Sequence, residues 1–428
     1  MPPSAAWIPR AVKESVARGV VPKGTTHALI MSADATRTIA AEVTSAFPPG
    51  ALHTFAAKAN SLYGYLEVLE KAGFGCETAS IGEFEMANRV FAADKVVFDS
   101  PVKTIDELKR ALYLPCFLNV DNFQELERIA ALHAEKPVVA TIGLRVNPQV
   151  GFGAIGALST GNATSKFGVG LDDLAEEIVA AYKAHSFLTM IHVHTGSQGI
   201  GIPLMTKSIA KVVGFVESKL PAGQVRTLDI GGGLPVNFDS DEWTPSFADY
   251  GNALKEAVPS LWAPDAAMRV VTEFGRAIAA KAGVFVSRVE YTKTNGGRYI
   301  VQQHVGADVL IRQCWAPQEW QVRLAVFDGE SGEERTGDIV VSDVAGPCCF
   351  GSDLAARERP MPRAHVGDVI VLKDLGAYAH SSFSRYNLRQ APAVYLHDEA
   401  ASDASGAFRM IRRAETVAET LEFMMPGF

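Results

Sequence analysis

The stretch LHTFAAKANSLYGYLEVLEKAGFGCETAS, residues 52–80, contains an apolar run that ends on Lys58, a longer segment, and a second apolar run that holds Glu77. The same alternation of short apolar runs with longer helix-like segments continues from about residue 28 to residue 275. Regular alternation of this kind is typical of an α/β protein whose parallel sheet is built from βα units. About eight such units in roughly 250 residues predict a TIM-like (β/α)8 barrel.

The runs that we interpret as strands are HALIMSA (27–33), LHTFAAK (52–58), GCETAS (75–80), KVVFDS (95–100), CFLNV (116–120), VATIGLRVN (139–147), LTMIHVHTG (188–196), RTLDIGGG (226–233) and MRVVTEFG (268–275). After about residue 280 the pattern changes. GVFVSRVEYTKTNGGRYIVQQHV (283–305) reads as two strands around an Asn-Gly-Gly turn, and similar segments follow it. We therefore expect two domains: the barrel over residues 28–278, and a mostly antiparallel β-barrel domain formed by residues 1–27 and 279–428.

Composition and charge exclude several classes of function. Of the 428 residues, 48% are hydrophobic, and 40 basic against 48 acidic side chains give a net charge of −8. That balance disfavours nucleic acid or an anionic membrane as the partner. No apolar run approaches the roughly 18 residues of a membrane span, and the N-terminal segment lacks the apolar core of a signal peptide, so we expect a cytoplasmic protein. The five cysteines do not have the spacing of zinc ligands, and we expect no metal.

Polar side chains and glycines fall at or just past the ends of the expected barrel strands. In such a barrel the carboxyl ends of the strands carry the chemistry. A single polar residue there is more often a cap or a surface group, but the set as a whole indicates an active site. Its members are Lys58, Glu77, Arg145, His194, Gly231, Gly232, Gly233 and Glu273.

Three of the motifs at these strand ends also have a structural explanation. LDIGGGLP (228–235) places glycines after a strand, where backbone N–H groups can approach an anion, although a tight turn would explain them too. HVHTGS (192–197) brings a histidine that can be a satisfied core residue. TEFGR (272–276) brings a glutamate and an arginine that can form a structural ion pair.

Taken together, the set suits a ring cofactor that carries a phosphate and a reactive carbonyl. Lys58 would form an imine with the carbonyl, backbone amides would hold the phosphate, the imidazole of His194 would stack on the ring, and Glu273 would keep the ring nitrogen protonated. This is the chemistry of pyridoxal phosphate, whose protonated pyridine accepts the electrons left on Cα. We expect Lys58 to be buried, because burial lowers the pKa of an amine and leaves it neutral for attack.

The motifs resemble those of pyridoxal-phosphate-dependent decarboxylases of the alanine-racemase-like fold, in particular diaminopimelate decarboxylase and its relative ornithine decarboxylase. The resemblance runs nearly end to end, and the order and spacing of the motifs make it specific. The matching segments are FAAKANS (55–61), CETASIGEF (76–84), LRVNP (144–148), STGNATSKFG (159–168), HVHTGSQ (192–198), LDIGGGLP (228–235), EFGR (273–276), GPCCFGSD (346–353) and DLGAYAHSSFSRYN (374–387).

The resemblance implies a role for each matching residue. Lys58 would bind the cofactor covalently, Glu273 would bind the pyridine nitrogen, and His194 would lie on the ring face. It further implies a homodimer in which Cys349 acts from the neighbouring subunit and returns a proton to Cα, whereas Cys348 is expected to be a small buried side chain. The other implied cofactor residues are Glu77, Arg145, Ser197, Gly231, Gly232, Gly233, Gly275, Arg276 and Tyr378.

Three departures from the family pattern bear on the substrate. In diaminopimelate decarboxylases the residue after the catalytic cysteine is an acid that receives the distal ammonium, whereas Phe350 stands here. The family's Arg-Pro-Ala-Leu-Tyr run appears as IRQCWA (311–316), which keeps Arg312 but lacks the tyrosine, and Phe274 replaces a proline. Arg276 and Arg312 match the arginines that hold the distal carboxylate, a group that suits the arginine fork.

These departures predict a decarboxylase of altered specificity, whose substrate has a distal acidic group but no free distal amine. An ammonium facing Phe350 would stay unpaired, at a cost of roughly 1–3 kcal/mol. The substrate-binding residues would then be Arg276, Arg312, Phe350 and Tyr378. The alternative is an authentic meso-diaminopimelate decarboxylase that makes L-lysine. Further alternatives are an amino-acid racemase, which has a different motif set, and a non-catalytic regulatory homologue, which would have lost cofactor groups that are present here.

Overall fold

The computed structural model describes residues 5–151, 160–401, 407–425 and 427. Ser159, the first residue of the motif STGNATSKFG, lies outside the described residues. The chain divides into two compact units. The barrel unit comprises Ile39–Val236 and Trp243–Ile278, and the sheet unit comprises Met1–Thr38, Asn237–Glu242 and Ala279–Phe428.

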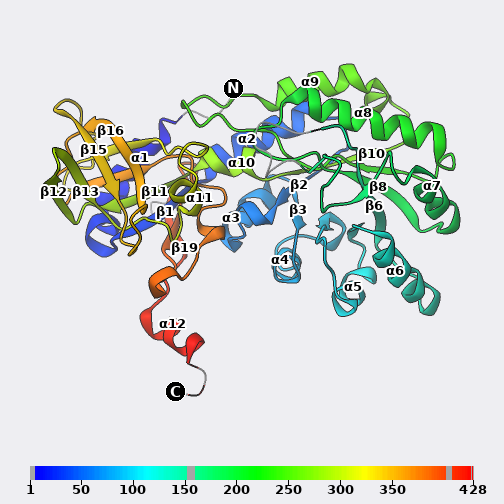
Figure 1. Cartoon of the computed structure of the whole chain (residues 1–428), viewed down its shortest axis with the longest axis horizontal. Coiled ribbons are helices and arrows are strands. Elements are labelled where there is room, and N and C mark those ends of the chain that lie inside the picture. The colour runs from blue at the N-terminus through cyan, green and yellow to red at the C-terminus, as the bar shows by residue number, and fades with distance from the viewer. Residues whose placement is uncertain (1–4, 152–159, 402–406, 426, 428) are drawn as a thin grey trace. The chain divides into compact units, whose positions relative to one another are not determined.

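The barrel unit is built on parallel strands that close into a ring, which confirms the predicted barrel (Figure 1). Eight of the nine strands of its sheet form the ring, because β5 pairs with β6 as well as with β4, and β10 pairs with β2. The ninth strand, β7 (Val169–Gly170), pairs only with β6. The ring strands are β2 (Leu52–Ala56), β3 (Gly75–Thr78), β4 (Val96–Phe98), β5 (Phe117–Val120), β6 (Thr141–Asn147), β8 (Leu188–Val193), β9 (Thr227–Asp229) and β10 (Arg269–Phe274).

Helices flank the ring strands, and side-chain caps explain where several of them begin. Ser80, Asn122 and Ser246 each accept a hydrogen bond from a first-turn backbone N–H, and Thr104 forms a capping box with Glu107. The helices are α2 (Ala33–Ala46), α3 (Tyr63–Lys71), α4 (Ile81–Ala87), α5 (Ile105–Leu112), α6 (Phe123–Glu135), α7 (Ala175–Ala184), α8 (Ile202–Lys219), α9 (Phe247–Ala257) and α10 (Arg276–Ala279), with short 3-10 turns η2 (Ala57–Ala59), η3 (Ala93–Lys95) and η5 (Pro259–Trp262).

The interior of the barrel separates apolar from polar side chains along the strands. A buried apolar cluster consists of Leu52, Val97, Phe117, Met190 and Val271. Burial of each such side chain contributes about 1.5–3 kcal/mol to stability. Further along the strands, towards their carboxyl ends, the buried side chains become charged or polar. The candidate site is therefore anchored on a closed apolar core.

The sheet unit holds two mostly antiparallel sheets, as predicted for the second domain. One has the order β14-β17-β11-β1-β18-β19 and the other β12-β13-β15-β16. The strands are β1 (His27–Ser32), β11 (Gly283–Arg288), β12 (Tyr291–Asn295), β13 (Arg298–Gln302), β14 (Leu324–Phe327), β15 (Ile339–Ala345), β16 (Leu354–Pro362), β17 (Val369–Leu372), β18 (Ala393–His397) and β19 (Phe408–Arg412). The helical segments are α1 (Trp7–Ala17), η1 (Val20–Gly24), η6 (Ala280–Ala282), α11 (Ile311–Trp315), η7 (His380–Ser382), η8 (Tyr386–Leu388) and α12 (Val417–Met424).

The assignment of HALIMSA to the barrel is wrong. This run forms β1, which pairs antiparallel with β11 and parallel with β18 in the sheet unit. All six residues of β1 are buried, as in a barrel strand, so the apolar run alone does not distinguish the two environments. The ring therefore begins with β2, and the two units meet along the chain at residues 38 and 39 rather than at residue 28.

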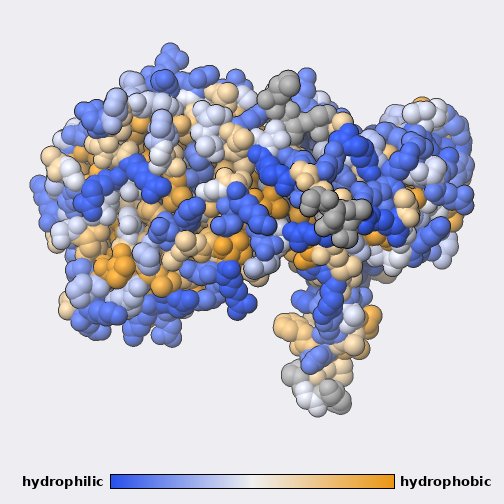
Figure 2. Space-filling view, turned by 180° about the vertical axis from the view of Figure 1, so that it is seen from behind, coloured by the Kyte–Doolittle hydropathy of each residue, from blue (hydrophilic) through white to orange (hydrophobic). Residues whose placement is uncertain are grey.

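The C-terminal helix α12 leaves apolar side chains exposed. It forms the narrow projection in Figure 2, where apolar colours recur along its surface. Phe423 is 70% exposed and Val417 is 59% exposed. Within the described ranges, no helix combines the length and the apolar character that a membrane crossing requires.

Candidate active site

The predicted lysine lies directly after a ring strand. Lys58 is in the η2 turn that follows β2, and its Nζ donates to Glu77 Oε2 over 2.7 Å. Glu77 is fully buried at the end of β3, whereas the Lys58 side chain is 39% exposed. Burial raises the pKa of Glu77 to about 8, against the attraction of Lys58. Lys58 is therefore only partly buried, less than expected, because it lies in the turn after the strand has ended.

The three glycines after β9 allow close backbone contacts that no side chain would tolerate. Gly231 and Gly233 have positive φ angles of 64° and 104°. A Cβ on Gly232 would lie 2.2 Å from the carbonyl oxygen of Glu273, and one on Gly233 would lie 2.1 Å from that of Gly196. The loop is therefore restricted to glycine by space as well as by conformation.

Two of the three glycine N–H groups are already used inside the protein. Gly231 N–H donates to Asp229 Oδ1 over 2.9 Å, and Gly232 N–H donates to His194 Nδ1 over 3.1 Å. The loop therefore has fewer N–H groups left for an anion than the sequence predicted. Among the hydrogen bonds of the described residues, Gly233 N–H is the one of the three not engaged in this way.

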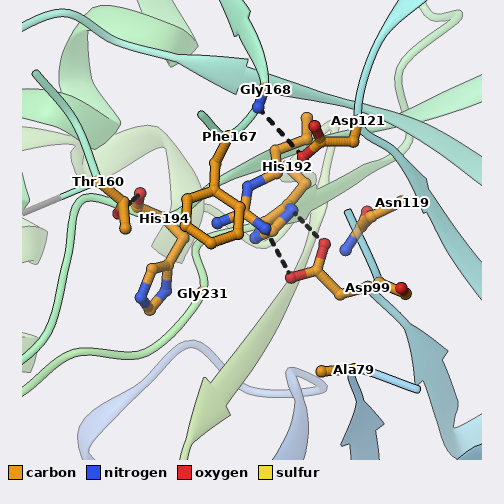
Figure 3. A network of polar contacts seen from close by, with 12 residues as sticks. Ala79, Asp99, Asn119, Asp121, Thr160, Phe167, Gly168, His192, His194 and Gly231 are labelled. Carbon is orange, nitrogen blue, oxygen red and sulfur yellow. Dashed lines mark hydrogen bonds and ion pairs between the residues drawn. The ribbon is translucent and has the colours of Figure 1, made fainter. Parts of the chain in front are cut away.

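The hydrogen bond from Gly232 also determines which ring nitrogen of His194 carries the proton. Because Nδ1 accepts, the ring proton is assigned to Nε2. Burial, with the positive charges of Arg145 and Lys58, lowers the pKa of His194 to about 3. Figure 3 shows the imidazole beside Gly231. A neutral, flat ring in this place is suited to stacking on an aromatic cofactor.

Four ionisable side chains, each in or directly after a ring strand, form a buried series. Arg145 of β6 contacts Asp99 over 3.0 Å, Asp99 contacts His192 Nδ1 over 3.3 Å, and His192 Nε2 contacts Glu273 Oε2 over 3.5 Å. Asp99 is thus the common partner of the first two contacts, and Figure 3 shows its carboxylate joined to its neighbours by dashed lines. All four side chains are at least nine-tenths buried. Glu273 Oε1 has no hydrogen-bond donor among the described N–H and hydroxyl groups.

Sequence reasoning identified Arg145 and Glu273 but missed Asp99 and His192. Asp99 follows β4 and His192 lies in β8, so both stand at strand ends by the same criterion that selected the others. Asp99, His192 and Glu273 present ligand atoms within 4.8 Å of one another, a geometry that also suits a metal ion. Arg145 on Asp99 adds a positive charge that disfavours a cation there.

Three further predicted residues lie around this series. Arg276 begins α10, and its Nη2 donates to Ser197 Oγ over 3.4 Å. A Cβ on Gly275 would lie 3.0 Å from the Cβ atoms of Ala56 and Ala59. Gly275 therefore lets β10 pack closely against the turn that carries the predicted cofactor lysine.

Phe167, which sequence reasoning also missed, covers Arg145. The Arg145 guanidinium carbon lies 4.4 Å from the centre of the Phe167 ring. Phe167 belongs to the motif STGNATSKFG, whose described part thus contributes a side chain to the site. An aromatic face against a guanidinium contributes about 0.5–2 kcal/mol, more when both groups are desolvated.

The predicted residues of the sheet unit form two groups of their own. Arg312 lies over the ring of Tyr378 at 4.7 Å and over that of Trp320 at 5.2 Å. Phe350 stacks on Trp315 with ring centres 4.6 Å apart. Trp315 was not singled out from the sequence, although it follows Arg312 by three residues on the same short helix.

The two adjacent cysteines differ in environment. Cys349 is exposed, and its N–H donates to Asn387 Oδ1 over 2.8 Å. Cys348 is buried, its N–H donates to Asp353 Oδ2, and burial raises the pKa of its thiol to about 11. Cys348 is therefore a small buried side chain, as expected.

The barrel residues fit a phosphate-bearing pyridine. Four features supply the contacts that such a group needs. They are a lysine amine, a buried glutamate oxygen that lacks a donor, a neutral imidazole and a glycine loop with no room for a Cβ. The Asp99–His192–Glu273 series adds buried charge beside the glutamate.

Comparisons with known proteins agree with this geometry. Residues 36–280 match the family model described as pyridoxal-dependent decarboxylase, pyridoxal binding domain. The chain is 36% identical over 374 residues to the diaminopimelate decarboxylase of Pseudomonas aeruginosa, covering 85% of this chain and 84% of the relative. The enzyme of the same name from Haemophilus influenzae is 34% identical over 377 residues, covering 85% of each. The crystal structure of diaminopimelate decarboxylase from Helicobacter pylori complexed with L-lysine superimposes with a TM-score of 0.83 at 27% identity, covering 94% of this chain and 98% of that one.

Proposed function

Because the chain belongs to the family of pyridoxal-dependent decarboxylases, we propose that it removes the α-carboxylate of an amino acid that carries a second, distal carboxylate. The enzyme is a pyridoxal-phosphate-dependent carboxy-lyase that resembles diaminopimelate decarboxylase. The observation that carries the proposal is the pairing of Lys58 with Glu77 over 2.7 Å, in the barrel whose buried Glu273 has an oxygen without a donor.

We assign the cofactor contacts as follows. Lys58 would hold pyridoxal phosphate covalently, Glu273 would accept the N–H of its ring, and His194 would cover the ring face. The Gly231–Gly233 loop, Ser197 and Arg276 would surround the phosphate and the substrate. When bound, the cofactor supplies an electron sink for the pair left on Cα after carbon dioxide leaves.

The proton that returns to Cα needs a donor outside this set. We propose the Cys349 thiol of a neighbouring copy, because Cys349 is exposed whereas Cys348 is buried with a raised thiol pKa. A homodimer with shared sites follows from this assignment. The exposed apolar side chains of α12 are consistent with a surface that a second copy covers.

The dimer can be tested by mixing two inactive variants, Lys58→Ala and Cys349→Ala. Random reassociation of the subunits places one intact site in half of the dimers, so roughly a quarter of the wild-type activity should return. Each variant alone should stay inactive. Mixing that restores nothing, while sedimentation shows that the subunits have exchanged, would contradict the shared site.

For the substrate, meso-diaminopimelate is the first candidate. The names of the relatives support it, and a guanidinium group such as that of Arg312 would suit a distal carboxylate. The comparisons give no support to the altered specificity expected from the sequence. A second candidate is a 2-amino acid with a distal carboxylate and no distal amine. It is supported by Phe350, which stacks on Trp315 and stands where a carboxylate would receive an ammonium.

Carbon dioxide release from purified enzyme distinguishes the two candidates. The panel is meso-diaminopimelate, 2-aminopimelate, lysine and ornithine, with Lys58→Ala as the inactive control. The first candidate predicts the highest kcat/KM for diaminopimelate, and 2-aminopimelate as the preferred substrate would support the second. A kcat/KM for lysine equal to that for the better of the two candidates would refute the distal carboxylate that both candidates share.

A further inference from the structure

The predicted role of Glu273 requires an ionised carboxylate, although its buried surroundings favour the protonated form. It is 4% exposed, and three other buried carboxyl groups, Asp99, Asp229 and Glu77, interact with it. A carboxylate in such surroundings gains a proton unless a positive charge is held beside it. With the proton on Glu273, a pyridine nitrogen bound there would be neutral, and the electron sink would be weaker.

The barrel provides that charge from β8. His192 is completely buried, with Nδ1 at 3.3 Å from Asp99 and Nε2 at 3.5 Å from Glu273. Arg145 closes the far end on Asp99 at 3.0 Å. Charge thus alternates along the series as Arg145 positive, Asp99 negative, His192 positive and Glu273 negative, which is the favourable order for buried ions.

We propose that His192 is a positioning residue for the cofactor: its imidazolium, held between Asp99 and Glu273, keeps Glu273 ionised and oriented so that Oε1 accepts the ring N–H. His192 itself does not touch the cofactor in this assignment. It acts through Glu273, and Asp99 with Arg145 acts through His192. The inference does not depend on which amino acid the enzyme decarboxylates.

The protonation of the neighbours supports the assignment. Burial alone would lower the pKa of His192, but attraction by Asp99, Asp229 and Glu273 raises it well above its usual value. Burial, the largest single influence, raises the pKa of Glu273, but the attraction of His192 and that of Lys58 together make the net direction down. Burial raises the pKa of Asp229 well above its usual value. Lys58 also attracts Glu273, but its amine is the group assigned to the cofactor, so His192 remains as the permanent cation.

The test uses holoenzyme loaded with pyridoxal phosphate that carries 15N in the ring. The 15N chemical shift reports directly whether the ring nitrogen is protonated. His192→Gln keeps a buried polar side chain of similar volume but removes the charge. We expect the ring-nitrogen resonance to move towards the unprotonated value, and kcat to fall by about 10- to 100-fold, the range for loss of an outer-shell partner.

His53→Gln is the matched control. His53 is also a buried barrel histidine, but it lies in β2 with Nδ1 3.0 Å from Thr272 Oγ1 and outside the series, and burial keeps it neutral with a pKa of about 4. Its 15N shift and kcat should remain those of the wild type. A wild-type ring-nitrogen shift in folded His192→Gln would overturn the proposal.

If His192→Gln does not fold, Asp99→Asn gives the second test. Removing the carboxylate on the far side of His192 should move the resonance in the same direction by a smaller amount. An unchanged shift in Asp99→Asn would refute the series. Stoichiometric binding of a divalent metal by wild type that is lost in both variants would also overturn it, since a metal would then supply the charge.

Discussion

Substitution of Gly232 by alanine should strongly destabilise the barrel. The added Cβ would lie 2.2 Å from the carbonyl oxygen of Glu273 and 3.2 Å from Phe274 Cα. Both neighbours are backbone atoms of ring strand β10, so neither can rotate away as a side chain would. Overpacking of this kind typically costs about 1–3 kcal/mol, and the rigid neighbours place Gly232 at the upper end, about 3 kcal/mol.

Gly214→Ala provides the matched control, because the chemical change is the same and the surroundings are opposite. Gly214 is exposed in α8, and a Cβ there meets nothing within 4 Å. Alanine in an exposed helix interior is favoured by about 0.8–1 kcal/mol over glycine. Gly214→Ala should therefore stabilise the protein while Gly232→Ala destabilises it.

Thermal unfolding of the two variants measures the difference. For a unit of about 150–250 residues, 1 kcal/mol moves the Tm by about 2–4 °C. Gly232→Ala should thus lower the Tm by roughly 6–12 °C, and Gly214→Ala should raise it by roughly 2–4 °C, on the same basis. Gly232→Ala should also bind pyridoxal phosphate more weakly, because the clash of the added Cβ would displace the backbone N–H that donates to His194. A Gly232→Ala Tm within 2 °C of wild type would refute the geometric reasoning.

Three further outcomes are expected. Lys103 is buried in an ion pair with Glu125 at 2.7 Å, so Lys103→Met should cost about 3–5 kcal/mol in urea unfolding by leaving an unpaired buried charge, and adding Glu125→Gln should recover much of it. Burial lowers the pKa of His27 to about 3 in the folded state, below its ordinary 6.5. The unfolded chain therefore binds this proton first, stability falls as the pH drops from about 6.5 towards 3, and His27→Gln should flatten that slope in urea unfolding. Iodoacetamide should modify exposed Cys349 well before buried Cys348, and peptide mass spectrometry that finds Cys348 modified first would contradict the assigned environments.

The barrel could be read from the sequence because its evidence is local. Each ring strand is a short apolar run, each is followed by helix-forming residues, and caps such as Thr104 with Glu107 mark where helices begin. The error at HALIMSA has the same origin. A fully buried strand carries no mark of the sheet to which it belongs, because pairing of β1 with β11 and β18 depends on residues about 250 and 360 positions away.

The candidate site was only partly accessible in this way. Strand-end position selected Lys58, Glu77, His194 and Glu273, since in a barrel these ends converge whatever the connecting loops are. The same criterion applies to Asp99, which follows β4, but the sequence did not show its contacts with Arg145 and His192. The sequence also did not show that the Gly232 N–H donates to His194, because the two residues are 38 positions apart.

The sequence by itself determined which chemical groups are present and in what order the strands deliver them. Lysine, histidine, glutamate and the glycine loop follow from residue type and spacing alone. Only the tertiary structure decided their surroundings: Lys58 is partly exposed and paired with Glu77, burial lowers the pKa of His194, and His192 lies between Asp99 and Glu273, whose attraction raises its pKa. The physical reason is that charge state depends on burial and on neighbours within a few ångströms, and those neighbours come from strands far apart in the chain.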